Sequence, residues 1–404
     1  MRALTVIDRS RTFHEVVCSR KPVIALVNQG KSWNEDEHTL SWTDLANALL
    51  VYLLFDVEAT IRPVSLLYVL YAQLIRRKLD EGTIKSFSDI LLALHNFMRE
   101  IYIREDQVFM TWRLSQSFKL EGHELAPDDD SQWEELYLRT SIRLNEWSQQ
   151  PISLSLCDGS LSSLVSWSPD WSNYSTRLLL NHHASVFLAA GNIQIKPESV
   201  GTQNMTEELS GYWVCRGYTI DIIHKRSEEA MPPRRHCDHY AVADNAYFFT
   251  EWYEFANQHA RKRAADQVLL EFADTIQARG CGHIWENPDS TEEDRIQRVT
   301  QFLRFLEDPD EILSNKVRIF YAACFPSHER RFAITRNGHF CLVPAASKDG
   351  DLVCIPYGSR VPYIFRQMRG KTTLNNIGEA YVYGIMQGEG YTVDVRDEQE
   401  FVLV

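Results

Sequence analysis

The spacing of apolar residues changes along this chain, and that change constrains its fold more than any other feature. Before about residue 150, apolar residues recur at the 3.6-residue period of helices, as in SLLYVLYAQLIRRKL and SFSDILLALHNFMREIYI. After a serine-rich stretch at 153–175 the period shifts towards 2, as in GYWVCRGYTIDIIHK, which indicates strands. We therefore expect an α+β protein.

The same pattern predicts four segments. Residues 1–150 should be mostly helical, and 151–230 should hold the serine-rich loop and then strands. A second helical block is expected at 231–315, and an antiparallel β-meander or small barrel at 316–404.

Two helix starts carry a capping-box pattern, in which a Ser or Thr is followed three residues later by Glu or Gln. The pairs are Ser131 with Glu134, and Ser290 with Glu293. Each precedes a stretch with helical periodicity, so the sequence predicts that a helix begins at both places.

The strand region has turn signals of its own. Asn337-Gly338 is a strong hairpin signal, and PYGSR at 356–360 is expected to be a second hairpin tip. Gly217 is a possible bulge or turn within a strand. The stretch ASVFLAAGNIQIK, residues 184–196, is also expected to be a strand.

Composition excludes several classes of protein. The net charge of the 404 residues is −13, which argues against nucleic acid as a partner. The N-terminus, MRALTVIDRSRTFHE, lacks the apolar run of a signal peptide. The longest apolar segment, LANALLVYLLF, is much shorter than a membrane span. We therefore expect a cytoplasmic protein without a membrane partner, with its eight scattered cysteines reduced and mostly buried.

Three stretches together resemble one family. They are WSPDWS at Trp167–Ser172, GDLVCIPYGSRVPYIFR at Gly350–Arg366, and GEAYVYGIMQGE at Gly378–Glu389. The chain is similar to fungal heterokaryon-incompatibility (HET) domain proteins, without the family's N-terminal TIR-like block. That block is the part related to NAD-hydrolysing domains, so the resemblance carries over neither NAD cleavage nor incompatibility signalling. It implies a HET-derived scaffold with another use, such as the cyclisation steps in which HET-like proteins of fungal natural-product clusters are implicated.

Catalytic motifs are absent from the sequence. It has no G-x-S-x-G elbow, no H-E-x-x-H, no phosphate-binding glycine loop and no dinucleotide fingerprint. RRHCDHY at 234–240 and CGH at 281–283 supply zinc-ligand types, but not at the paired spacing of structural zinc sites. We expect neither a cofactor nor a metal.

An enzyme without such motifs can still hold one reactive conformer of its substrate. Proximity and orientation remove roughly 7–11 kcal/mol from a barrier, and each aimed hydrogen-bond donor adds about 3–4 kcal/mol. The leading hypothesis is therefore a cofactor-independent cyclase of fungal secondary metabolism, an intramolecular Diels-Alderase acting on an apolar polyene, terpenoid or polyketide. The residues expected to shape its cavity are Trp167, Trp171, Tyr357, Tyr363, Tyr381 and Tyr383. The polar contact is expected from Arg360, Glu379 or His183.

Plainer interpretations stand beside this one. The two tryptophans can plug a core, and the tail aromatics can pair across a sheet, with Glu379 bound to an arginine. Alternation predicts that Glu379, Tyr381 and Tyr383 share one face of a strand. At the level of function, the alternatives are a non-enzymatic HET-derived interaction or regulatory protein, and an acid–base isomerase or dehydratase. A deep apolar cavity between the helical block and the β tail favours the cyclase, whereas a filled core with an exposed apolar patch favours the interaction protein.

Overall fold

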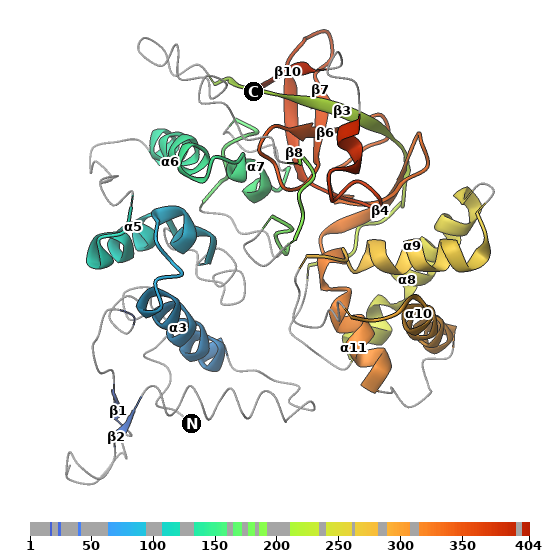
Figure 1. Cartoon of the computed structure of the whole chain (residues 1–404), viewed down its shortest axis with the longest axis horizontal. Helices are drawn as coiled ribbons and strands as arrows, with labels where there is room; N and C mark the ends of the chain where they lie inside the picture. Colours follow the sequence, from blue (N-terminus) through green and yellow to red (C-terminus); the bar gives the residue numbers. More distant parts are fainter. Residues whose placement is uncertain are drawn as a thin grey trace. The chain divides into compact units, whose positions relative to one another are not determined.

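A computed structural model shows helices followed by a mostly antiparallel sheet, which confirms the α+β prediction (Figure 1). The structure describes residues 17, 23–25, 39–41, 64–93, 107–121, 133–159, 165–171, 177–181, 186–191, 211–233, 240–260, 263–281, 289–307, 315–392 and 398–404. The chain forms two compact units. The first comprises Met1–Gln132, Trp171–Tyr174 and His236–Asp238, and the second comprises Trp133–Asp170, Ser175–Arg235 and His239–Val404.

The described elements of the first unit are mostly helical. They are β1 (Val23–Ala25), β2 (Thr39–Ser41), α3 (Val64–Asp80) and α5 (Gln107–Phe118), with a further helical stretch at 87–93. β1 and β2 pair antiparallel. The helices bury apolar side chains such as Ala72, Ile75, Phe87 and Leu114, as the helical periodicity of the sequence predicts.

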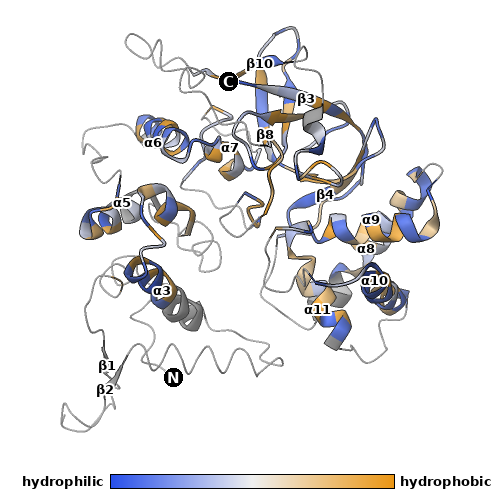
Figure 2. Ribbon diagram, in the orientation of Figure 1, coloured by the Kyte–Doolittle hydropathy of each residue, from blue (hydrophilic) through white to orange (hydrophobic). Residues whose placement is uncertain are grey.

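The second unit holds the remaining helices and the sheet. Its helices are α6 (Trp133–Ser148), α7 (Ile152–Leu156), α8 (Tyr240–His259), α9 (Ala265–Ile276), α10 (Glu292–Glu307) and α11 (Asn315–Ala323), with 3₁₀ turns η3 (Phe325–Ser327) and η4 (Glu389–Thr392). Figure 2 shows hydrophobic residues along α9, which packs against α10 and β5. Phe249, Phe272 and Phe302 pack there with Phe332 of the sheet in one aromatic core. The Phe249 and Phe302 rings meet edge to face, and the Phe272 and Phe332 rings are tilted. This core joins the helices to the sheet.

The start of α10 lies one residue beyond the predicted capping box. Thr291, not Ser290, caps the helix: the Asp294 backbone N–H donates to Thr291 Oγ1 at 3.1 Å, and the Asp294 carboxylate accepts from the Thr291 N–H at 3.2 Å. The pair Ser290–Glu293 was therefore wrong as the box, because Asp294 is short enough to reach back and Thr291 supplies an equivalent hydroxyl. The other predicted pair begins at Ser131, which lies outside the described residues.

The sheet contains a ring of strands. The strands are β3 (Trp213–Arg226), β4 (Arg330–Thr335), β5 (Phe340–Pro344), β6 (Leu352–Pro356), β7 (Tyr363–Gln367), β8 (Leu374–Glu379), β9 (Tyr381–Val382) and β10 (Gln399–Leu403). Their order is β10-β8-β7-β6-β3-β4-β5-β9, and β10 also pairs with β3. β10 pairs antiparallel with β3 and, through Leu403 and Leu374, parallel with β8, so that β3, β6, β7, β8 and β10 form a partial ring. A β region at 316–404 is confirmed, but the ring also takes in β3, from outside that range, and one parallel pairing.

β3 serves both the ring and the extension of the sheet. Residues 213–217 pair with β10, residues 217–222 pair with β6, and residues 223–226 pair with β4. The register shifts between Thr219 and Asp221, two residues beyond the predicted bulge at Gly217. Gly217 has a different role: a Cβ there would lie 2.2 Å from the Ile355 carbonyl oxygen, so only glycine allows β6 to approach this closely.

The predicted turns are confirmed, and one predicted strand is not. Asn337-Gly338 joins β4 to β5, with Gly338 at φ +92° and its N–H donating to the Thr335 carbonyl at 2.9 Å. Residues 356–360 turn between β6 and β7. The described part of the strand expected at 184–196, residues 186–191, is irregular. Its N–H groups donate to the carbonyls of Gly280, Met386, Arg360 and Ser359 instead of forming a regular ladder.

Candidate functional site

Glu379, one of the predicted catalytic residues, is enclosed at the end of β8. Its side chain is 0% exposed. Oε1 accepts from the Leu180 N–H at 2.6 Å and from Arg330 Nη2 at 2.9 Å, and Oε2 accepts from the Asn181 N–H at 3.2 Å. These donors satisfy the carboxylate within the protein. Glu379 therefore fixes residues 177–181 to the sheet, as in the plainer interpretation that pairs it with an arginine.

Arg330, at the start of β4, is the cation of this cluster and is also 0% exposed. It donates to the Pro326 carbonyl at 2.7 Å and to the Leu178 carbonyl at 2.9 Å. Burial, with a smaller contribution from the nearby Arg177, lowers the pKa of Arg330 to about 9, and Glu379 opposes that shift. Arg177 in turn donates to the carbonyls of Ser155 and Cys157. The cluster thus connects α7, residues 177–181 and the sheet in the interior.

Two of the predicted aromatic residues of the tail, Tyr363 and Tyr381, are buried. Tyr363 and Glu379 are partners across β7 and β8. The Tyr363 hydroxyl lies 2.7 Å from Ser155 Oγ and 3.2 Å from the Pro151 carbonyl oxygen, and burial raises its pKa. Tyr381 is buried with its ring centroid 5.9 Å from that of Phe187.

Glu379, Tyr381 and Tyr383 do not share one strand face as predicted. β8 ends at Glu379 and β9 covers Tyr381–Val382 alone. The break lies at Ala380, where the chain changes neighbours: β8 pairs with β7, whereas β9 pairs with β5. Tyr383 lies beyond β9, half-buried in the turn, and its carbonyl oxygen is 3.1 Å from His339 Nδ1.

The remaining predicted site residues are not among the contacts that the structure describes for the Glu379–Arg330 cluster. Trp167 is buried, donates to the Gly211 carbonyl at 3.3 Å and has its ring centroid 6.3 Å from that of Trp213. Trp171 is buried as well but belongs to the first unit, so the tryptophans of the WSPDW stretch are divided between the two units. Tyr357 donates to Glu398 at 2.6 Å, and burial and this bond raise its pKa. Arg360 donates to the Phe187 carbonyl at 3.3 Å. His183 lies outside the described residues.

The described cysteines carry no nucleophile signature. Cys157, Cys215, Cys281, Cys324, Cys341 and Cys354 are all buried and free of disulfides. Burial raises the pKa of each thiol for which a shift is resolved, that of Cys354 to about 12. They are small core residues, as predicted.

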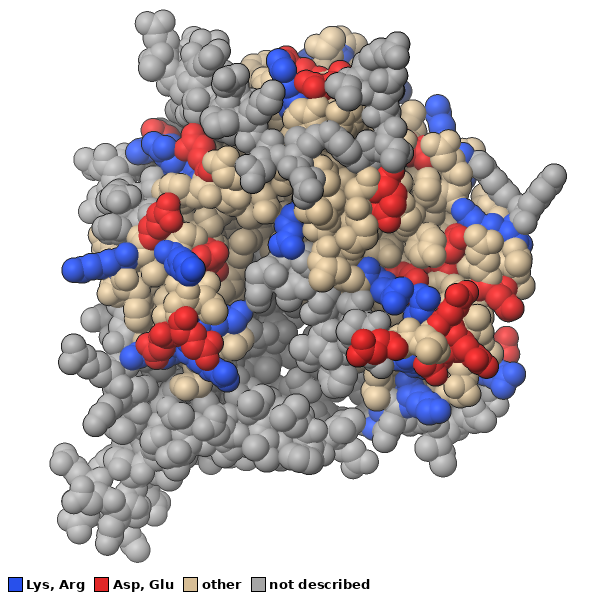
Figure 3. All heavy atoms as spheres, viewed as in Figure 1, with Lys and Arg blue, Asp and Glu red and all other residues tan. Residues whose placement is uncertain are grey.

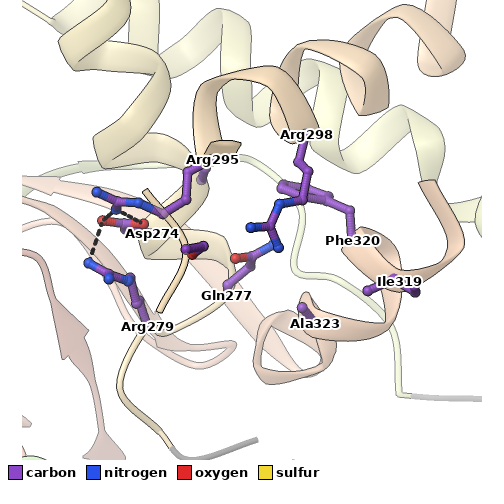
Figure 4. A pocket seen from close by; sticks show the side chains of 10 residues that line it. Asp274, Gln277, Arg279, Arg295, Arg298, Ile319, Phe320 and Ala323 are labelled. Carbon is purple, nitrogen blue, oxygen red and sulfur yellow. Dashed lines mark hydrogen bonds and ion pairs between the residues drawn. The ribbon is translucent and has the colours of Figure 1, made fainter. Parts of the chain in front are cut away.

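A pocket that the sequence did not reveal lies on α9, α10 and α11. Its polar lining includes Asp274, Arg279, Arg295 and Arg298, all outside the predicted set. Figure 4 shows Arg279 and Arg295 on either side of the Asp274 carboxylate, with Arg298 beside Gln277. Two sequence signals could have indicated it: an aspartate within the apolar stripe of α9, and arginines three residues apart on α10.

The electrostatics of this pocket centre on Asp274. Arg295 Nη1 binds both carboxylate oxygens, at 2.7 and 2.5 Å, and Arg279 Nη1 lies 3.9 Å from one of them. Burial raises the pKa of Asp274, while the hydrogen bonds and charge of Arg295, followed by the charge of Arg279, oppose the shift. The pocket is therefore a cationic site that already holds one carboxylate of its own.

The described part of the chain contains no group of three or more His, Cys, Asp or Glu side chains placed to bind a metal ion. The zinc-ligand types at 236–239 and His283 lie outside it. No helix within the described ranges is long and apolar enough to cross a membrane.

Comparisons with known proteins place this geometry in context. The Het-6 beta-barrel domain family matches residues 284–404, a range that includes α10, α11 and every ring strand except β3. The chain is 36% identical over 286 residues to "Heterokaryon incompatibility protein 6, OR allele" of Neurospora crassa. The match covers 60% of this chain and 40% of that relative. No solved structure matches the chain.

Proposed function

We propose, from the premise that this chain carries a Het-6 beta-barrel domain and is a distant homologue of heterokaryon incompatibility protein 6, that it is a non-enzymatic recognition or regulatory protein. In this role the second unit is a folded support, and its surface binds a partner protein. The relative's name refers to heterokaryon incompatibility, and the proposal takes from it only the binding of a partner protein.

The internal use of Glu379 is the observation that carries the proposal. Its carboxylate is fully buried and receives hydrogen bonds from Leu180, Asn181 and Arg330. A carboxylate that is buried and hydrogen-bonded to internal donors stabilises the fold and is shielded from a substrate.

The burial of residues predicted to shape a substrate cavity also supports a non-enzymatic role. Trp167, Tyr363 and Tyr381 are packed within the protein, and none of the predicted residues lines the pocket on α9–α11. Large apolar side chains are instead exposed on the second unit, at Val186, Leu188, Tyr212, Tyr247 and Ile319. Burial of the predicted cavity residues is the feature that supports an interaction protein over a cyclase, because a cyclase needs those side chains to contact its substrate.

The test joins labelling in cells to binding with purified proteins. The whole chain, fused to a biotin ligase, is expressed in Neurospora crassa beside the ligase alone. Proteins enriched by the fusion are then purified and titrated with the unfused chain by calorimetry. We expect at least one to bind with a Kd below about 10 μM, in the range of specific complexes.

Two results would overturn the proposal. One is that no enriched protein binds the purified chain. The other is that the purified chain, without added cofactor, accelerates ring closure of a linear polyene or polyketide over buffer, which would support the cyclase hypothesis.

A further inference from the structure

The pocket on α9–α11 has more positive than negative side chains in its lining. Arg279, Arg295 and Arg298 face a single carboxylate, that of Asp274. Glu292 and Asp294 lie nearby on the exposed first turn of α10, and the Asp294 carboxylate is engaged by Thr291. In Figure 3, side chains of both signs gather over this part of the molecule. Since the whole chain carries −13, a local excess of cations is specific to the pocket and does not follow from composition.

The three arginines differ in how far their guanidinium groups are already used. Arg295 is committed to Asp274 through both carboxylate oxygens. Arg279 is 36% exposed and lies 3.9 Å from the same carboxylate, at the limit of an ion pair. Arg298 donates its Nε–H to the Asp294 carbonyl at 3.3 Å. Within the described residues, the terminal nitrogens of Arg298 are therefore the donors best placed for an incoming anion.

The remaining wall is apolar. Ile319, Phe320 and Ala323 of α11 line it, and Ile319 is 43% exposed. A guanidinium fork beside an aliphatic surface fits a carboxylate that has an apolar group next to it, because a bare inorganic anion gains nothing from Ile319.

The small volume of the pocket indicates what kind of molecule can carry this carboxylate. The cavity volume is about 30 Å³, far below the roughly 300–1,000 Å³ of clefts that enclose small-molecule ligands. It has room for the end of one side chain. The rest of the binding energy has to come from the surface around the pocket, which a protein segment can cover and a free acid cannot.

We infer that this pocket binds an aspartate or glutamate of a partner protein, with the carboxylate on Arg298, supported by the charge of Arg279, and an adjoining apolar side chain on Ile319. The inference rests on the proposed function, because it names the chemistry by which a partner is recognised. Arg295 is a positioning residue here: it neutralises Asp274, so that this carboxylate does not repel the incoming one.

The experiment uses a defined probe, so that it does not depend on the partner's identity. A fluorescein-labelled peptide with a central Leu-Glu-Glu-Leu sequence is titrated with the whole chain by fluorescence anisotropy, beside a peptide with Leu-Gln-Gln-Leu. We expect the glutamate peptide to bind at least about tenfold tighter, and to weaken as salt rises, since carboxylate recognition is electrostatic.

Variants then locate the binding. R298A is expected to weaken the glutamate peptide about tenfold or more, R298K to restore part of that loss, and I319A to weaken both peptides about equally, roughly three- to tenfold. R304A is the matched control, because Arg304 is exposed on the same helix but is not among the pocket residues. It should bind like the wild type.

The outcomes separate this inference from the proposed function. Equal affinity for the two peptides, or an equal loss in R298A and R304A, would refute the pocket assignment. Competition by free glutamate as strong as by the peptide would refute a protein segment as the ligand. If a partner found by labelling binds R298A as tightly as wild type, the recognition function stands and this pocket is not its site.

Discussion

Glu379 shows how far a side chain's role depends on neighbours that are distant in sequence. Its type and its place near two tyrosines suggest a polar contact to a substrate, and only contacts with Leu180, Asn181 and Arg330 identify it as an internal link. These partners are 199, 198 and 49 residues away along the chain. No local pattern reports such distances, so the sequence could name the residue but not its role.

The first prediction tests that role. E379Q places an amide nitrogen where one carboxylate oxygen now accepts a hydrogen bond, and it leaves the Arg330 guanidinium buried without its counter-ion. Removing one partner of a buried ion pair costs about 3–5 kcal/mol. Urea unfolding should show that loss, whereas E400Q, at an exposed position in β10, should stay within about 0.5 kcal/mol of wild type. A small loss of unfolding free energy in E379Q would contradict the structural role of the Glu379–Arg330 ion pair.

Asp274 gives a prediction with a definite sign in pH. Its folded pKa is raised from the model-compound value of 3.8, so the folded state holds this proton to a higher pH than the unfolded state does. The stability contributed by the neutral acid is therefore complete below pH 3.8 and is lost as pH rises through the folded pKa. The unfolding free energy of wild type relative to D274N should fall over that window.

Asp294 provides the opposite control for the same measurement. The hydrogen bonds from Thr291 lower its pKa, so its contribution is present above the ordinary aspartate range and is lost as pH falls. Wild type relative to D294N should therefore gain stability as pH rises. Slopes of the same sign in the two comparisons would show that the environment assigned to Asp274 is incorrect.

At the scale of elements, local patterns predicted most of what the structure shows. The Asn337-Gly338 turn and the strand from Trp213 to Arg226 are confirmed because alternation and turn chemistry are properties of adjacent residues. The α10 cap was misplaced by one residue, since Thr291 and Asp294 compete with Ser290 and Glu293 for the same role. Residues 186–191, part of the strand expected at 184–196, instead donate to carbonyls in three separate segments.

β3 supplies a prediction about the fit of one element against its neighbour. In G217A the new methyl group would meet the Ile355 carbonyl oxygen and the Pro356 Cα at 2.2 and 2.7 Å, both backbone atoms, so β6 has to move away. Overpacking of this kind costs about 1–3 kcal/mol or more. G350A is the control, because nothing lies within 4 Å of a Cβ there, although its positive φ adds about 1 kcal/mol of strain. Thermal unfolding should rank G217A clearly below G350A.

At the scale of the whole molecule, the ring depends on strand pairings that the sequence pattern could not predict. Composition and periodicity predicted α+β and a small barrel, but pairing of β10 with both β3 and β8 is a property of the folded chain. The division into units at Trp133 likewise depends on packing and not on a change of composition. The pocket on α9–α11 was missed for the same reason, since Asp274 and Arg298 meet only after three helices have packed.

Ring closure is testable by removing its closing strand. Deleting residues 398–404 takes away β10, with the buried Phe401 and Leu403, and opens unpaired edges on β3 and β8. Free strand edges promote association between molecules. We expect the shortened chain to bind a hydrophobic dye and to aggregate in light scattering at concentrations where the intact chain stays clear. A monomeric, dye-negative product would show that the ring does not need β10.

The distance between β3 and β10 along the chain also has a consequence for synthesis in the cell. About 170 residues separate the end of β3 from the start of β10, and ribosomes add about 5–20 residues per second. A newly made β3 therefore waits roughly ten to thirty seconds for the last of its three partner strands. During translation this strand is a natural substrate for chaperones that shield nascent chains.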